Sequence, residues 1–244
     1  MTDFATRLTN AERRQDWPNV RPRDASTLIL IDRKGKQPRV LMGRRHPGLK
    51  FMPGVYVFPG GRLEKTDKAM PVYGVMDADS ERRLMTRVQR PTLARARGLA
   101  AACIREMYEE TGLLVGTREL GAPQAPCEAW RVFEERGVFP DLGALTYVAR
   151  AITPPRRPKR FDTRFFAADA NAVCDEVKGL VGENSELVEL RWLTFAQTAK
   201  EELPTVTRVV LEEVAQRIEA GFHARLPVPF YAMHRGTFLR TLLD

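Results

Sequence analysis

The sequence predicts an α/β protein in which a mixed β-sheet lies between helices. Short apolar segments typical of strands and segments with helical periodicity follow one another irregularly, without the regular strand–helix–strand order of a parallel sheet. The clearest single element is a long helix that ends at Gly112. The chain has 244 residues, 43% hydrophobic and 29% charged, which suits one well-buried globular domain over residues 1–244.

The first part of the chain predicts a surface arm and then three strands. Residues 1–24 are polar and rich in arginine, with little periodicity, and are expected to form an N-terminal arm. Strands are expected at 26–31 and 39–44, joined as a β-hairpin by a turn. A third strand at 55–58 runs directly into the turn Pro59-Gly60-Gly61.

The next segment, residues 68–97, has its own helical pattern and is expected to form a small inserted helical lobe. Asp79 or Ser80 could cap a helix in it, and Pro91 would break that helix. Thr92 is then expected to cap the long helix.

Beyond Gly112 the pattern predicts strands, helices and an apolar tail that packs back on the body. In strand 187–193, the side chains of Val188, Leu190 and Trp192 are expected to face inward. The expected elements are a strand at 113–115, a short helix at 127–136, strands at 145–152, 161–167 and 187–193, a helix at 205–219 capped by Thr205, and a C-terminal tail at 222–244.

Three carboxylates share one face of the long helix. At roughly 100° per residue, Glu106, Glu109 and Glu110 fall within about one third of the helix circumference, and apolar residues occupy the opposite side. Like charges so placed repel each other, which either water or bound cations must relieve. Because the cluster contains hard oxygen donors and no histidine or thiol, the cation expected is Mg²⁺ or Mn²⁺.

These residues and their flanks resemble the signature of the Nudix hydrolase superfamily. Residues 105–113, Arg-Glu-Met-Tyr-Glu-Glu-Thr-Gly-Leu, match the second half of that signature in full. The first half differs twice, since Asp67 stands where glutamate is usual and 37 residues, against seven in the signature, separate it from Arg105. The resemblance implies a Nudix fold, an α/β/α sandwich with a mixed sheet, into which the lobe at 68–97 is inserted.

The resemblance also implies a metal-dependent reaction and assigns roles to the motif. Glu109 and Glu110 would be the main Mg²⁺ or Mn²⁺ ligands, and Glu106 a further ligand or the general base. Arg105 would orient a carboxylate of the motif. A carbonyl of Gly61 would complete the metal shell. The alternative is a solvated helix face beside an ordinary turn.

For several candidate residues, the sequence allows more than one role. Asp67 could pair with Arg105 or cap the inserted lobe. One of three late carboxylates could join the site. Arg45 and Arg160, with Gly60 and Gly61, are the expected substrate-binding residues, although both arginines could equally be solvated. The wider candidate sets are Arg44, Arg45 and His46; the basic turn Arg156, Arg157, Lys159 and Arg160; and the late carboxylates Glu183, Glu186 and Glu189.

The wider pattern is similar to the coenzyme A diphosphatase-like branch of the superfamily. The segments that carry this similarity are 45–46, 51–54, 57–61, 152–154 and 160–166. It implies hydrolysis of a nucleoside diphosphate derivative, with coenzyme A or acyl-coenzyme A favoured. The alternatives are ADP-ribose, NADH or a nucleotide sugar as substrate, or a non-catalytic nucleotide-binding module. The inserted lobe and the basic turn are expected to determine which substrate is chosen.

Composition restricts the setting and the partners. No apolar run is long enough for a membrane span, and the first residues lack the apolar core of a secretory signal. Cys103, Cys127 and Cys174 are expected to be free thiols in a reducing cytoplasm. The net charge of +8 suggests an RNA-directed enzyme as an alternative. However, no basic run is interleaved with aromatic residues, so nucleic acid is not the expected partner. A homodimer is implied only by its frequency in the family.

Overall fold

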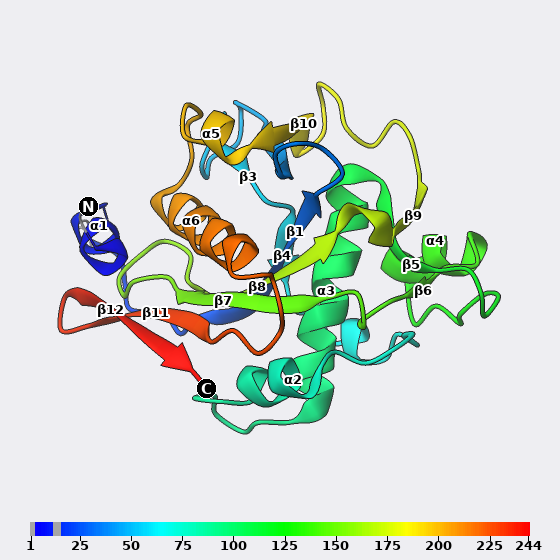
Figure 1. The fold of residues 1–244 in the computed structure, drawn as a ribbon, viewed down its shortest axis with the longest axis horizontal. Coiled ribbons are helices and arrows are strands. Elements are labelled where there is room, and N and C mark those ends of the chain that lie inside the picture. The colour runs from blue at the N-terminus through cyan, green and yellow to red at the C-terminus, as the bar shows by residue number, and fades with distance from the viewer. Residues whose placement is uncertain (1–2, 12–15) are drawn as a thin grey trace.

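The computed structural model describes residues 3–11 and 16–244, and in it a sheet lies between two layers of helices (Figure 1). Its strands are β1 (Arg23–Asp32), β2 (Arg39–Arg45), β3 (Tyr56–Val57), β4 (Gly60–Arg62), β7 (Thr146–Ile152), β8 (Phe161–Asp169), β10 (Leu187–Thr194), β11 (Val228–His234) and β12 (Thr237–Leu243). Within the described residues their order is β10-β2-β1-β8-β7-β11-β12, with β3 beside β2 and β4 beside β1. The pairs β1–β8 and β7–β11 are parallel and the others antiparallel, which confirms the predicted mixed sheet.

Helices cover both faces of this sheet (Figure 1). On one face lie α1 (Phe4–Ala11), α5 (Phe195–Thr198) and α6 (Thr205–Glu219), and on the other lie α2 (Ala78–Leu84) and α3 (Leu93–Thr111). Strand β1 is buried on both faces, because Leu28 and Leu30 pack toward α3 while Ile29 and Ile31 pack toward α6. The predicted α/β/α sandwich is therefore confirmed.

A smaller sheet and short helical turns cover the outer side of α3. The sheet consists of β5 (Leu113–Thr117), β6 (Phe139–Pro140) and β9 (Val173–Glu176). Beside it lie α4 (Arg131–Glu135) and the 3₁₀ turns η1 (Thr66–Lys68), η2 (Glu128–Trp130) and η3 (Ala170–Ala172). Because η1 and β5 also pack on α3, the helix is buried all round from residue 98 to 105, and not on one face alone as expected.

The ends of α3 are those that the sequence predicts. The Thr92 side chain accepts a hydrogen bond from the backbone N–H of Arg95 at 3.2 Å. At the other end Gly112 adopts the left-handed conformation with φ of 81°, and its N–H donates to the carbonyl of Tyr108. The carboxylates of the motif therefore leave the interior only in the last turns of the helix.

The N-terminal arm expected over residues 1–24 has more structure than its composition indicates. Residues 4–11 form α1, whose Ala5 and Leu8 are buried in the core on the α6 side. The arm ends earlier than expected, because Arg23 already belongs to β1 and its N–H donates to the carbonyl of Arg160. Residues 1–2 and 12–15 of the expected arm lie outside the described residues.

The inserted segment also differs from its expected bounds of 68–97. Its helix α2 is capped by Asp77, which accepts from the N–H of Ser80 at 2.9 Å, and not by Asp79 or Ser80. Its last five residues, 93–97, belong to α3, because the cap at Thr92 starts that helix earlier. The lobe is fixed to the far end of the main sheet, where Arg83 donates to backbone carbonyls of residues 224–226.

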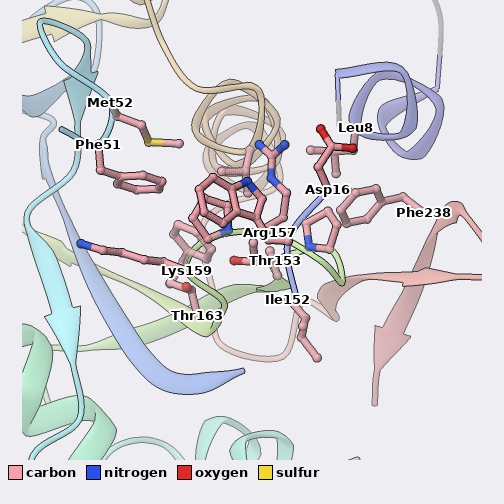
Figure 2. A pocket seen from close by; sticks show the side chains of 16 residues that line it. Leu8, Asp16, Phe51, Met52, Ile152, Thr153, Arg157, Lys159, Thr163 and Phe238 are labelled. Carbon is pink, nitrogen blue, oxygen red and sulfur yellow. The ribbon is translucent and has the colours of Figure 1, made fainter. Parts of the chain in front are cut away.

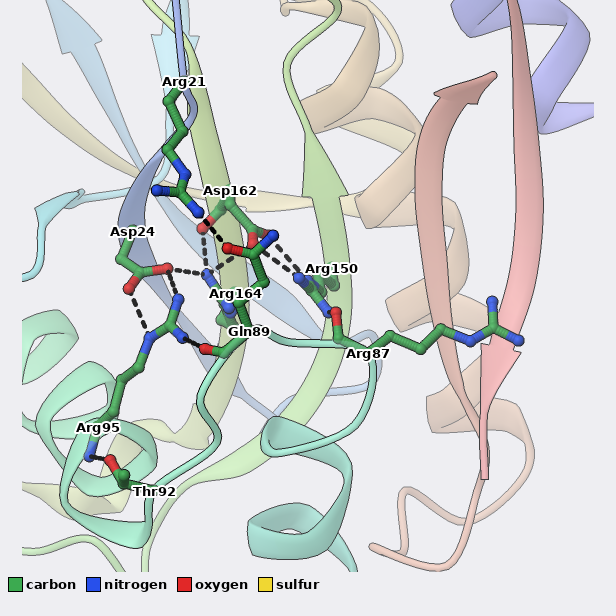
Figure 3. Close-up of polar contacts among 9 residues, drawn as sticks. All are labelled: Arg21, Asp24, Arg87, Gln89, Thr92, Arg95, Arg150, Asp162 and Arg164. Carbon is green, nitrogen blue, oxygen red and sulfur yellow. Dashed lines mark hydrogen bonds and ion pairs between the residues drawn. The ribbon is translucent and has the colours of Figure 1, made fainter. Parts of the chain in front are cut away.

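A network of ion pairs joins the first turn of α3 to the sheet (Figure 3). Asp24 of β1 accepts from Arg95 of α3 at 2.7 and 2.8 Å and from Arg164 of β8 at 2.7 Å. Asp162 accepts from Arg150 at 2.8 and 2.7 Å. Burial opposes the charge on Asp24, but the hydrogen bond from Arg95 and the charge of Arg164 outweigh it and lower the pKa of Asp24. The network fixes the start of the helix whose other end carries the carboxylates.

Two expectations about the late strands need correction. The tail expected at 222–244 does not merely pack on the body, because β11 pairs with β7 and extends the main sheet. In β10, Trp192 is 36% exposed and not an inward residue, whereas Leu187 and Leu193 are buried. Trp192 lies in the regular part of β10, beyond the β-bulge that follows Leu187, and the position of β10 at the edge of the sheet accounts for its exposure.

The cysteines agree with a further expectation. All three cysteines are free, and Cys103 is buried within α3. Among residues 3–11 and 16–244, every helix is too short or too polar to cross a lipid bilayer.

Candidate active site

Carboxylates from several segments surround one cavity at the C-terminal end of α3. Among the described residues, five glutamates line this cavity of about 620 Å³, namely Glu64, Glu106, Glu109, Glu110 and Glu186. Gly60 and Gly61 of β4 line it as well. The cavity, called here the carboxylate cavity, thus unites both halves of the predicted motif although 37 residues separate Asp67 from Arg105.

The alternatives for Asp67 are resolved by its contacts. Arg105 donates through Nε and Nη2 to the two oxygens of Asp67, at 2.8 and 3.2 Å, and both residues are 2% exposed. The same carboxylate also accepts from the backbone N–H of Glu64, two residues before η1, at 2.7 Å. Asp67 therefore pairs with Arg105 and also stabilises the turn that precedes the inserted lobe.

Arg105 in turn holds two of the glutamates. Its Nη1 donates to Oε1 of Glu106 and to Oε2 of Glu109, both at 2.8 Å. Because Arg105 is buried, these contacts fix the directions in which the two side chains leave the helix. Arg105 lines the carboxylate cavity as well, but its hydrogen bonds to Glu106 and Glu109 give it the role of orienting these two carboxylates.

The negative charge in the cavity is only partly compensated. Burial raises the pKa of Glu106 to about 7; the charge of Arg105 opposes this rise, and that of Glu109 adds to it. Burial and then the charges of Glu186 and Glu106 raise the pKa of Glu110 well above its usual range. Burial also raises the pKa of Glu109, against the charge of Arg105. A cation bound among these groups would relieve their mutual repulsion.

The donor set fits a hard divalent cation without forming a complete cage for one. Across the described residues, no three side chains of the usual metal-binding types converge as a ready-made site. Two of the glutamates do not converge with the others because their carboxylates accept hydrogen bonds from Arg105; these two are Glu106 and Glu109. Mg²⁺ commonly takes one or two carboxylates and completes its shell with water and substrate phosphates, so oxygen donors in this number suit it.

Of the three late glutamates, the structure brings Glu186 to the cavity. Arg45, which was expected to bind substrate, also lines the cavity and forms an ion pair with Glu186 at 2.7 Å. Glu183 is exposed and lies outside the lining. Glu189 faces another partner, because its Oε2 accepts from the hydroxyl of Tyr56 at 2.8 Å.

Arg160 does not take the place expected for it. Its guanidinium donates to Asn19, to the carbonyl of Val20 and to that of Thr153, so it anchors the segment before β1 and lies outside the cavity lining. From the same basic turn, Lys159 lines the carboxylate cavity instead. The sequence marked this turn as basic but could not show which of its side chains points inward.

The inserted lobe does not contribute to the cavity, contrary to the expectation that it determines the substrate. None of residues 68–97, all of which the structure describes, lines the carboxylate cavity. The lobe packs at the N-terminal end of α3, and the carboxylates lie at the C-terminal end of the same helix. Nor do Arg44 and His46 line it; Arg44 donates to the carbonyl of Gly54, and His46 Nδ1 accepts from the N–H of Gly48.

An apolar cavity that the sequence did not predict adjoins the carboxylate cavity. It has a volume of about 490 Å³, and Phe51, Met52 and Lys159 line both cavities. Figure 2 shows these three residues on one side of it and Leu8 and Phe238 on the other. Its walls come from segments far apart in the sequence, so no local pattern could have revealed it. The two cavities form a continuous groove, acidic at one end and apolar at the other.

No protein-family model matches the sequence. Over 181 residues, 70% of this chain, the sequence is 25% identical to "Putative nudix hydrolase 7" of Caenorhabditis elegans, and the match spans about half, 51%, of that protein.

Solved structures share the fold. A crystal structure of a NUDIX hydrolase from Alicyclobacillus acidocaldarius superposes with a TM-score of 0.57 at 27% identity, over 80% of this chain and 92% of that one. The NUDIX domain of Shewanella oneidensis NrtR, in a cocrystal structure with ADP ribose, gives a TM-score of 0.46 at 14% identity, over 89% and 99% of the two chains. The latter likeness is too weak to bear on the ligand of this chain.

Proposed function

We propose that this chain, a member of the Nudix hydrolase superfamily, hydrolyses the diphosphate of a nucleoside diphosphate linked to another group, with Mg²⁺ or Mn²⁺ as cofactor. The observation that carries the proposal is the crowding of Glu106, Glu109 and Glu110 beside a glycine turn, with Arg105 holding the first two. A nucleotide-binding module without activity would have no need for this arrangement of crowded, mutually repelling carboxylates.

Each residue of the site would have a separate role in the reaction. Glu109 and Glu110 would hold the cation, and Glu106 would serve as a further ligand or as the general base that takes a proton from the attacking water. When bound, Mg²⁺ neutralises charge on the diphosphate and lowers the pKa of the water. Lys159 lies in the same cavity and would attract the phosphates of the substrate.

Gly61 would allow the diphosphate to approach the backbone closely. A Cβ at this position would collide with the carboxylate of Glu106, so the turn and the helix touch without a side chain between them. We expect Gly61→Ala to lower kcat by about 100-fold, because it displaces Glu106 from its position beside the reacting atoms.

The measurement for this variant is steady-state kinetics with saturating Mg²⁺, together with circular dichroism to show that the fold is retained. Gly182→Ala is a matched control, since a Cβ there would meet nothing within 4 Å. Equal activity of Gly61→Ala and Gly182→Ala would contradict the placement of the reaction beside Gly61.

Coenzyme A or an acyl-coenzyme A is the substrate we favour. The support is the groove itself, because the apolar cavity begins where the carboxylate cavity ends and its volume lies in the range of about 300–1,000 Å³ found for ligand pockets. A substrate with a diphosphate and an apolar arm would occupy both parts. A substrate with sugars on both sides of the diphosphate would leave the apolar part unused.

A panel of substrates tests this choice. With Mg²⁺, we expect coenzyme A or an acyl-coenzyme A to give the highest kcat/KM among coenzyme A, ADP-ribose, dinucleotides and NADH. Product identification should show phosphopantetheine, free or acylated, and adenosine 3′,5′-bisphosphate, which keeps the 3′-phosphate of coenzyme A. A preference for ADP-ribose with no cleavage of coenzyme A would overturn the choice of substrate while leaving the diphosphatase proposal in place.

A further inference from the structure

We propose that Trp130 is a positioning residue for the carboxylates of α3, acting through Asp67 and Arg105. Its indole Nε1 donates to Oδ1 of Asp67 at 3.3 Å, across 63 residues of sequence. Trp130 does not belong to the motif. It is the last residue of the 3₁₀ turn η2. The inference rests on the proposed function, since it assigns a task within the same site.

All N–H groups of the Arg105 guanidinium donate hydrogen bonds. A guanidinium carries five N–H groups, and each of them donates to a different acceptor or oxygen in this structure. Nε and Nη2 reach Asp67, Nη1 reaches Glu106 and Glu109, and Nη2 also reaches the carbonyl of Arg62 at 3.0 Å. The orientation of Arg105 is therefore set by its acceptors, of which Asp67 accepts two of the five bonds.

Asp67 is equally saturated. A carboxylate has about four lone-pair positions, and four hydrogen bonds end on this one. Two come from Arg105 itself. The other two come from different segments, with the N–H of Glu64 at Oδ2 and the indole of Trp130 at Oδ1. These two outside donors prevent the carboxylate from turning about its own axis together with Arg105.

Trp130 is suited to this task by its own packing. It is completely buried, and its ring centroid lies 5.0 Å from that of Phe133 in α4. A buried indole needs a hydrogen-bond acceptor, and a buried carboxylate needs donors, so each satisfies the other. The rigid ring places its N–H at one oxygen of Asp67 more precisely than a flexible side chain or water would.

Without the indole N–H, only Arg105 would hold Oδ1 of Asp67. The Asp67–Arg105 pair could then shift as a unit, and the contacts of Arg105 to Glu106 and Glu109 would loosen. Trp130→Phe is therefore expected to weaken Mn²⁺ binding to the substrate-free protein by about 10-fold, as partners behind metal ligands commonly do. It should lower kcat while leaving KM for the substrate nearly unchanged, because Trp130 lies outside both cavities.

Calorimetric titration with Mn²⁺ tests the inference, with Phe133→Leu as the matched control. Phe133 is also fully buried and touches Trp130, but its ring has no donor for Asp67. Both variants should lower the Tm, and only Trp130→Phe should weaken Mn²⁺ binding. Equal Mn²⁺ affinities in the two variants would reduce Trp130 to a packing residue and overturn the inference. Absence of Mn²⁺ binding in the wild-type protein would instead overturn the proposed function, and this inference with it.

A second measurement uses the wild-type protein alone and decides the question if Trp130→Phe does not fold. Of the three tryptophans, Trp17 is 55% and Trp192 36% exposed, whereas Trp130 is completely buried. NMR should therefore show one indole N–H that exchanges slowly with solvent, and Asp67→Asn should shift its resonance. Rapid exchange of all three indole protons would show that the hydrogen bond to Asp67 is not maintained and would overturn the inference.

Discussion

Replacing Glu110 with glutamine is expected to lower kcat by at least about 100-fold with the fold intact, because the change removes a charge from the proposed metal shell. Glu110 lies in the last turn of α3, where burial and the charges of Glu186 and Glu106 raise its pKa. The neutral amide relieves this repulsion, so the metal-free variant should melt no lower than the wild-type protein. Activity and stability should thus respond in opposite directions, as is common where function requires an unfavourable group.

The measurements are initial rates at saturating Mg²⁺ and thermal unfolding in the presence of a chelator. Glu183→Gln provides a control of the same chemistry, since Glu183 is exposed and lies outside both cavities. Glu109→Gln should resemble Glu110→Gln in its loss of kcat. Full activity in a well-folded Glu110→Gln protein would refute the site.

Among substitutions of polar residues, the replacement of Asp67 with alanine is expected to lower the stability of the protein most. The change leaves the buried guanidinium of Arg105 without the acceptor of two of its hydrogen bonds. Breaking a buried ion pair by removing one partner typically costs about 3–5 kcal/mol. For a chain of this length we expect the Tm to fall by roughly 6–20 °C.

Urea and thermal unfolding measure this effect directly. Glu128→Gln serves as the control, because Glu128 pairs with Arg131 on the surface, where the two side chains are 83% and 56% exposed. A pair of that kind contributes about 0–1 kcal/mol. If Asp67→Ala were no more destabilising than Glu128→Gln, the buried pair would have no structural role.

Elements with a local signal could be predicted from the sequence, and α3 shows why. Its cap at Thr92 and its end at Gly112 each depend on one residue and its nearest neighbours. The hairpin of β11 and β12 has no such signal, because its place in the sheet depends on parallel pairing with β7. The burial of Trp192 was assigned wrongly, since the position of β10 at the edge of the sheet leaves no mark in the alternation of residues.

The candidate site divides in the same way. The motif on α3 and the turn at Gly61 were recognisable because their spacing is fixed by helix and turn geometry. The choice of Glu186 over Glu183 and Glu189, and of Lys159 over Arg160, depends on which way neighbouring side chains point in a loop or an extended turn. The role of Trp130 could not be predicted for another reason, since its partner Asp67 lies 63 residues away in the sequence.

The apolar cavity depends on two segments that are synthesised far apart in time. Leu8 of α1 and Phe238 of β12 both line it, and the hydroxyl of Thr9 accepts from the N–H of Phe238, 229 residues later in the chain. The acidic end of the groove requires nothing beyond Glu186 for its carboxylates. During translation, the groups proposed to break the diphosphate are therefore all made before Phe238, which completes the wall of the apolar cavity. A ribosome-bound chain that lacks β12 would contain all the proposed catalytic carboxylates but not the Phe238 side chain that lines the apolar cavity.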